Sequence, residues 1–193
     1  PCKDRARSYA LSLRHRFESG YVVMHLRNGG SKITVAGIEM KAVPWNDGHI
    51  STLPDALLRY AENIPNDCHC ELPLVIISDS AWFSSQMQMI LNGKMRVFTQ
   101  GTQVVHLDRP QSGNDETCDQ SFFDLAVMGS ALEVVGTAGR FGLLGSILFA
   151  EKVIPFYRSV DAENLMSHVM QAVKCSCAPN RLLRRANIGW YRV

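Results

Sequence analysis

The residues best suited to chemistry follow short apolar runs that are typical of buried strands. Arg27 comes directly after the run Tyr21–Leu26, and His25 lies two positions before it, on the same face of that strand. Asp79 follows a second apolar run, and the Gly-rich turn Gly136–Arg140 follows a later one and opens a helix. Because ligands bind outside the carboxyl ends of parallel strands, these residues are expected to gather at one edge of a sheet.

The Gly-rich turn has the composition of a phosphate-binding turn. A helix start carries unpaired backbone N–H groups and a partial positive charge, which suit a phosphate. Gly136 and Gly139 permit positive φ and let a ligand approach the backbone. Arginine forks, such as those of Arg27 and Arg140, bind phosphate in a bidentate way. The carboxylate of Asp79 can accept hydrogen bonds from ribose or guanine, so the set favours a nucleoside diphosphate over a metal ion.

Each of these residues also has a purely structural interpretation. The glycines would permit tight packing of the strand against the helix, and Arg27 would pair with a carboxylate on the surface. His25 would be a core histidine bonded to the backbone, and Asp79 would cap the helix that follows it. Asp124, inside an expected helix, would simply be solvated. Joint placement at strand ends is what favours a functional interpretation.

Apolar periodicity predicts alternating helices and strands. The expected helices are Arg5–Glu18, Thr52–Ile64, Ala81–Leu91, Phe122–Gly129, Phe141–Phe149 and a last helix that is capped by Asp161 and runs to Val173. The expected strands are Tyr21–Leu26, Leu74–Ile77, Met95–Phe98, Leu132–Val135 and Val153–Pro155, with a small strand pair in Ile33–Met40 and a loop over Leu107–Cys118.

Strands that alternate with helices imply parallel strands joined by right-handed crossovers. The expected fold class is therefore α/β, a doubly wound and mostly parallel five-stranded sheet with helices on both faces. Residues 1–173 are expected to form one Rossmann-like nucleotide-binding domain, followed by a Cys- and Arg-rich tail over residues 174–193.

The composition is that of a globular domain. The chain has 193 residues, of which 46% are hydrophobic and 20% charged, enough for one domain with a sizeable core. A formal net charge of +2 gives no case for a nucleic-acid partner. No apolar run reaches the roughly 18 residues of a membrane span, so none is expected in this chain.

Six cysteines include two C-x-C pairs, Cys68-His69-Cys70 and Cys175-Ser176-Cys177. An even count fits a disulfide set, but spacing alone does not assign the pairing and leaves free thiols open. The C-x-C spacing differs from that of most structural zinc sites, so no metal site is expected.

Three motifs, taken in order, resemble the donor-binding half of GDP-fucose-dependent fucosyltransferases. This group contains the α1,2-, α1,6- and protein O-fucosyltransferases. The motifs are H-x-R at His25 and Arg27, S-D-S around Asp79, and DLxxMxxAxxVVGTxGxFGxLxxxL from Asp124 onward. The resemblance extends from Tyr21 to about Phe156.

The resemblance implies a two-domain enzyme of the GT-B type, in which the second domain holds the nucleotide sugar. Arg27 would be the catalytic group, holding the β-phosphate of the donor and stabilising the departing GDP, with His25 beside it. Asp79 and Asp124 would lie near the nucleoside. The remaining substrate-binding residues, at the pyrophosphate and the base, would be Thr137, Gly139, Arg140 and Phe141.

The implied reaction is transfer of fucose from GDP-fucose to a hydroxyl of a glycan or protein acceptor, without a metal or another cofactor. The sequence departs from the family pattern at Arg140, which replaces a serine, and at Asn28–Gly30, which replaces a second arginine and an acidic residue. A missing N-terminal domain is also implied, so this chain alone is not expected to be a complete enzyme. The implied location is the lumen of the Golgi or ER in a eukaryote and the cytoplasm in a bacterium.

Two other functions fit the same residues. One is a glycosyltransferase that uses a different sugar nucleotide, such as a UDP or ADP donor. The other is a non-catalytic fucosyltransferase-like module that binds another protein.

Overall fold

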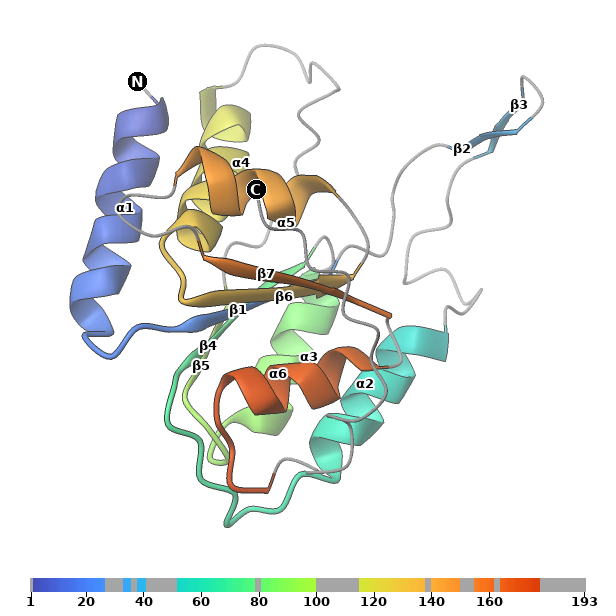
Figure 1. Ribbon diagram of the computed structural model, residues 1–193. Helices are drawn as coiled ribbons and strands as arrows, with labels where there is room; N and C mark the ends of the chain where they lie inside the picture. Colours follow the sequence, from blue (N-terminus) through green and yellow to red (C-terminus); the bar gives the residue numbers. More distant parts are fainter. Residues whose placement is uncertain are drawn as a thin grey trace.

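A five-stranded sheet forms the centre of the computed structural model (Figure 1). All neighbouring strands in the sheet run parallel, in the order β5-β4-β1-β6-β7. This arrangement confirms the predicted doubly wound α/β fold. The strands are β1 (Val22–Leu26), β4 (Leu74–Ser78), β5 (Val97–Thr99), β6 (Glu133–Thr137) and β7 (Phe156–Val160). The structure describes residues 2–26, 33–35, 38–40, 52–78, 81–99, 115–137, 140–149, 155–161 and 164–177.

Helices cover both faces of the sheet (Figure 1). One face carries α1 (Cys2–Arg16), α4 (Asp115–Gly129) and α5 (Arg140–Leu148), and the other carries α2 (Thr52–Glu62), α3 (Ala81–Leu91) and α6 (Leu165–Ala172). Side chains of β1 alternate between the two cores, so that Val23 packs with the first set and Met24 with the second. Burial on both faces explains why β1 and β4 read as continuous apolar runs.

Most predicted elements are present close to their expected bounds. The predicted small strand pair is formed by β2 (Ile33–Val35) and β3 (Ile38–Met40), which run antiparallel. Gly20 and Gly93 follow α1 and α3 with φ of +82° and +88°, a left-handed conformation that favours glycine at the end of a helix. Among the described residues, no helix is both long and apolar enough to cross a membrane.

The predicted last strand, Val153–Pro155, lies outside the described residues except for Pro155, which is not in a strand. The last strand that the structure describes is Phe156–Val160, which the prediction missed. Arg158 and Ser159 make this segment too polar to register as an apolar run, because β7 lies at the edge of the sheet and its side chains are only partly buried.

The starts of helices α4 and α6 also differ from the prediction. Helix α4 begins at Asp115, so that Asp115–Cys118, expected in a loop, is helical. Apolar periodicity begins only at Phe122, whereas the acidic residues before it suit a first helical turn. Helix α6 begins at Leu165, and its N-cap residue is Asn164 and not Asp161, which was the expected cap. The backbone carbonyl of Asp161 accepts a hydrogen bond from the backbone N–H of Asn164 at 2.9 Å.

Helices α4 and α5 pack with their backbones in contact, which fixes the position of α5 over the sheet. A Cβ placed on Gly129 would lie 2.5 Å from Cβ of Phe149 and 2.8 Å from the carbonyl oxygen of Gly145. A Cβ on Gly145 would in turn lie 2.8 Å from Cβ of Met128. Glycine is therefore needed at both positions of this helix crossing.

Gly129→Ala is expected to lower the free energy of unfolding by about 2 kcal/mol. The alanine gains up to ~1 kcal/mol of helix propensity, but overpacking against backbone atoms that cannot rotate away costs up to ~3 kcal/mol. Urea unfolding measures the change, with Ser85→Ala at an exposed position of α3 as the control. A Gly129→Ala chain as stable as the control would contradict this packing.

Candidate functional site

The strand order creates a topological switch point at the carboxyl ends of β1 and β6. From β1 the chain winds outward through β4 to β5, and then crosses back to β6 and β7 on the other side of β1. Ligands of open α/β sheets bind where the winding reverses in this way. His25 and Gly136 face each other there as register partners, and Thr137 is the next residue of β6.

His25 is enclosed by two glycines. Its side chain is buried, with the residue only 4% exposed. A Cβ placed on Gly136 would lie 3.1 Å from the carbonyl oxygen of His25, and one on Gly142 would lie 3.2 Å from its Nδ1 atom. The Cβ on Gly142 would also lie 2.8 Å from Cε2 of Tyr157, whose burial raises the pKa of its hydroxyl. The first turn of α5 is therefore held next to the imidazole.

The expected role of Gly136 in the turn was wrong. Gly136 is a strand residue, paired with His25 on one side and with Ser159 on the other. It provides room beside His25, and the glycines with positive φ in the described part of the chain are Gly20 and Gly93. The connection from β6 to α5 consequently runs only from Thr137 to Arg140.

Thr137 ends β6 on the opposite side of the strand from Gly136, because strand residues alternate between faces. Its Oγ1 atom is buried and has no hydrogen-bond partner among the described residues. Leaving a buried hydroxyl unpaired costs free energy, of the order of 1–3 kcal/mol. A ligand at the switch point could supply that partner.

Most of the other predicted site residues lie wholly or partly outside the described part of the chain. Arg27, Asp79 and Gly139 lie outside the described residues. Arg140 and Phe141 are the first two residues of α5, and their side chains are likewise outside the description. The backbone of α5 therefore begins at the expected place, directly after the carboxyl end of β6.

Asp124 lies in helix α4 and is half-buried. Its neighbour Phe123 packs edge-on against Tyr9 of α1, with ring centroids 5.2 Å apart, and Leu125 on its other side is buried in the core. The structure thus places Asp124 in the helical layer that covers the sheet.

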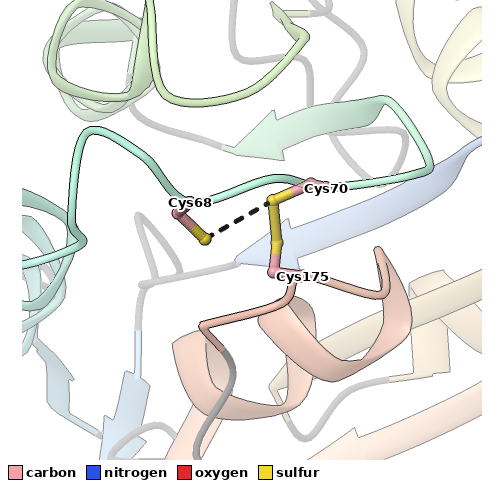
Figure 2. Close-up of side chains that lie close together, drawn as sticks. All are labelled: Cys68, Cys70 and Cys175. Atoms are coloured by element: carbon pink, nitrogen blue, oxygen red, sulfur yellow. Dashed lines mark hydrogen bonds between the residues drawn. A yellow bond between two sulfur atoms is a disulfide. The ribbon is translucent and has the colours of Figure 1, made fainter.

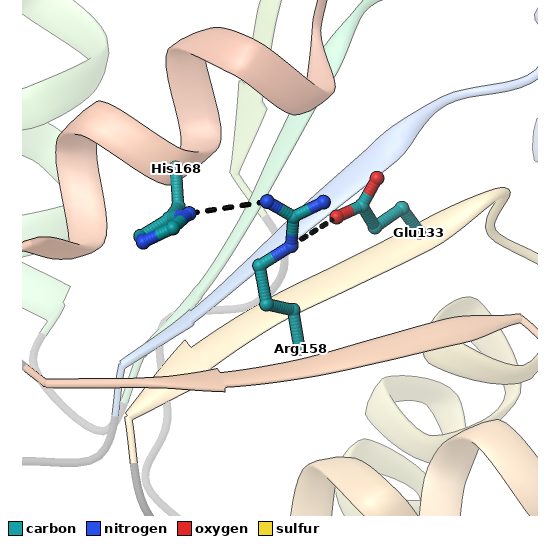
Figure 3. A network of polar contacts seen from close by, with 3 residues as sticks. All are labelled: Glu133, Arg158 and His168. Atoms are coloured by element: carbon teal, nitrogen blue, oxygen red, sulfur yellow. Dashed lines mark hydrogen bonds and ion pairs between the residues drawn. The ribbon is translucent and has the colours of Figure 1, made fainter. Parts of the chain in front are cut away.

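A polar cluster that the sequence did not predict joins Glu133, Arg158 and His168 beneath α6 (Figure 3). Nε of Arg158 forms an ion pair with Oε1 of Glu133 at 2.9 Å, and Nη1 lies 3.1 Å from Nδ1 of His168. Both members of the ion pair are more than four-fifths buried. Because the guanidinium can only donate, Nδ1 of His168 accepts, which leaves the ring proton on Nε2.

Burial is the largest influence on the pKa values of Glu133 and His168 in this cluster. It raises the pKa of the Glu133 carboxyl, and the Arg158 charge offsets only part of that rise. Burial also lowers the pKa of His168, and the nearby Arg158 charge lowers it further. Glu133 begins β6, so the cluster lies toward the amino ends of the strands, away from the switch point. We therefore interpret it as a structural link between α6 and the sheet edge.

His168 is expected to make folding stability fall as the pH drops below roughly 6.5. The folded chain resists protonation of His168, whereas the unfolded chain takes up the proton near the ordinary histidine pKa. The contribution is therefore complete above the unfolded pKa and is lost as the pH falls through the lower, folded pKa.

Urea unfolding between about pH 7 and pH 5 measures this dependence. His168→Gln should flatten it, because the amide oxygen still accepts from Arg158 without titrating. His15→Gln, on the exposed surface of α1, is the matched control and should leave the slope unchanged. If the stability of the wild-type and His168→Gln chains depends on pH in the same way, His168 is not the source of that dependence.

The two C-x-C pairs are joined to each other by two disulfides, Cys68–Cys177 and Cys70–Cys175. We call these four residues the cysteine clasp. It links the loop between α2 and β4 to the segment after α6, which contains the first residues of the predicted tail. Figure 2 shows Cys68 beside the Cys70–Cys175 disulfide, with the Sγ atoms of Cys68 and Cys70 4.0 Å apart. The pairing resolves alternatives that spacing left open.

Comparison with protein-family models, with curated proteins and with solved structures finds no match for this chain. The function is therefore inferred from the residues and their arrangement.

Proposed function

We propose that this chain is the donor-binding domain of a glycosyltransferase that transfers fucose from GDP-fucose to a hydroxyl of a glycan or protein. One observation carries the proposal. The register of β1 against β6 pairs His25 of the H-x-R motif with Gly136 of the Gly-rich motif, at the topological switch point of the sheet. Two motifs more than a hundred residues apart in sequence thus meet where nucleotides bind in this class of fold.

Groups at this edge suit a diphosphate. The first turn of α5 has backbone N–H groups without a partner within the helix and the positive end of the helix dipole, both favourable to an anion. Arg27 follows β1 directly and adds a guanidinium fork for bidentate contact with phosphate oxygens. The hydroxyl of Thr137, unpaired among the described residues, is available to donate to the same ligand.

The proposed reaction is displacement at the sugar carbon that carries the diphosphate, through an oxocarbenium-like transition state. As the bond to GDP breaks, negative charge grows on the β-phosphate. Arg27 and the start of α5 would stabilise that charge, and preorganised groups of this kind each contribute about 3 kcal/mol. Acceptor binding and any general base are assigned to a second domain.

The resemblance assigns the carboxylates of Asp79 and Asp124 to the surroundings of the nucleoside, and the choice of guanine rests on this assignment. Guanine presents two adjacent N–H donors on one edge, which a carboxylate can accept in a bidentate way. The corresponding edges of adenine and uracil each include an acceptor that would face the carboxylate. A carboxylate in the base pocket therefore favours GDP over ADP and UDP.

Isothermal titration of the chain with GDP, UDP and ADP tests this proposal. We expect GDP to bind at least about tenfold more tightly than the other two, a difference of ~1.4 kcal/mol. Equal affinity for all three would contradict the choice of donor. No binding of any nucleotide would contradict the proposal as a whole and favour a non-catalytic interaction module.

A further inference from the structure

The cysteine clasp brings four sulfur atoms together beside an isolated antiparallel β-bridge between Cys70 and Cys175. Between the cysteines, the backbone N–H of Ser176 donates to the carbonyl oxygen of His69 at 2.8 Å, and the N–H of His69 donates to Oγ of Ser176 at 3.2 Å. Each disulfide joins one cysteine of the first C-x-C pair to one of the second, which brings all four sulfurs together.

The four sulfurs form a single cluster. The Sγ atoms of Cys68, Cys70 and Cys175 all lie within 4.8 Å of one another, and Cys177 is bonded to Cys68. Cys68 and Cys175 are buried and the other two are half-buried. A group of sulfurs this compact is typical of a tetrahedral thiolate site for a borderline-soft cation.

One of the two disulfides would already provide most of the restraint that both together place on the unfolded chain. They link positions 109 and 105 residues apart, and therefore close almost the same loop. Once the first is formed, the second closes only the few residues between the two bonds and restricts the unfolded chain much less. The redundancy points to a second use for the four sulfurs.

Contacts independent of the disulfides also hold the two segments together. Nζ of Lys174 forms an ion pair with Oε2 of Glu71 at 3.2 Å, between the residues next to Cys175 and Cys70. The backbone N–H of Leu72 donates to the carbonyl oxygen of Val173 at 3.2 Å. Reduction of the disulfides would remove none of these bonds, so they would favour the folded arrangement in which binding of Zn²⁺ draws the four thiols together.

We propose that the cysteine clasp is a zinc site in its reduced form, in which four thiolates bind one Zn²⁺ ion. A tetrahedron with Zn–S bonds of about 2.3 Å has sulfurs about 3.8 Å apart. Cys68 and Cys70 already meet this spacing, with their Sγ atoms 4.0 Å apart. Each bonded pair needs to open by only about 2 Å, which side-chain rotation can provide.

Conversion of the two disulfides into a zinc site requires a reductant, and a dithiol can supply the electrons. Each disulfide accepts two electrons and two protons from one dithiol, which becomes a cyclic disulfide, and yields two cysteine thiols. Zn²⁺ then displaces the thiol protons to solvent, and four Zn–S bonds replace two S–S bonds. The clasp would thus hold α6 against the α2–β4 loop under both oxidising and reducing conditions.

The test is zinc retention by the full chain. The protein is reduced with dithiothreitol, exposed to Zn²⁺ alone, desalted and analysed by mass spectrometry under native conditions. We expect about one zinc per reduced chain and none per oxidised chain. Substitution of Cd²⁺ should give the ultraviolet absorbance of thiolate-to-metal charge transfer. A reduced chain that retains no zinc would overturn the proposal.

Variants identify the ligands. Cys2→Ser with Cys118→Ser removes the other two cysteines and should leave zinc retention and the Cd²⁺ absorbance unchanged. Cys68→Ser with Cys177→Ser should halve the Cd²⁺ absorbance and weaken zinc retention at least about tenfold. Circular dichroism before metal addition shows whether each chain is folded. Loss of metal in the first pair, or full retention in the second, would overturn the assignment.

Discussion

Replacing all four cysteines of the clasp with serine is expected to lower the free energy of unfolding by about 7 kcal/mol, whereas removing either disulfide alone costs only about 2 kcal/mol. The two disulfides share one long loop, which spans 109 or 105 residues. Loss of one leaves that loop closed by the other. Loss of the second releases it, and closing a loop of about 100 residues contributes about 4.7 kcal/mol in the chain-entropy treatment.

Guanidinium unfolding of oxidised protein measures these effects, with a chelator present so that metal does not contribute. The variants are Cys68→Ser with Cys177→Ser, Cys70→Ser with Cys175→Ser, and the combination of all four. Cys2→Ser with Cys118→Ser is the control. The full change approaches the whole stability of an ordinary domain, so the combined variant is expected to be largely unfolded. If the losses of the two single-disulfide variants add up to the loss of the combined variant, the shared-loop explanation is contradicted.

The strands that the sequence predicts best are those that are buried on both faces. Strands β1 and β4 were recognised because helices cover both of their faces, which forces continuous apolar runs. The helix Ala81–Leu91 has the bounds that were expected. Strand β7 was missed because an edge strand is partly exposed and carries Arg158 among its apolar residues.

The candidate site was predictable in its parts but not in its geometry. Motifs marked His25 and the Gly-rich segment, yet the register that pairs His25 with Gly136 depends on β6 crossing back to lie beside β1. The link between Glu133 and Arg158 was missed for the same reason, because the two residues come from adjacent strands, and only the fold brings them together. Nothing in the C-x-C spacing distinguished disulfides between the pairs from disulfides within each pair.

Under the proposed function, Arg27→Ala has the largest expected effect on activity. Hydrolysis of GDP-fucose to GDP and free fucose, which requires no acceptor, is a suitable readout, and its rate is expected to fall by about 10²–10³-fold. Loss of the guanidinium removes the charge that stabilises the departing diphosphate. Affinity for GDP should fall as well, because the same group contacts the β-phosphate in the bound nucleotide.

Arg27→Lys separates charge from shape in the same assay. Lysine keeps the positive charge but lacks the planar fork, so an intermediate rate is expected, with GDP affinity closer to that of the wild type. Arg59→Ala, at an exposed position of α2, removes an arginine away from the switch point and should change neither quantity. If Arg27→Ala matches Arg59→Ala in both GDP affinity and hydrolysis, then Arg27 does not touch the diphosphate. The pairing of His25 with Gly136 would then bring together two motifs that pack the sheet edge without serving a nucleotide.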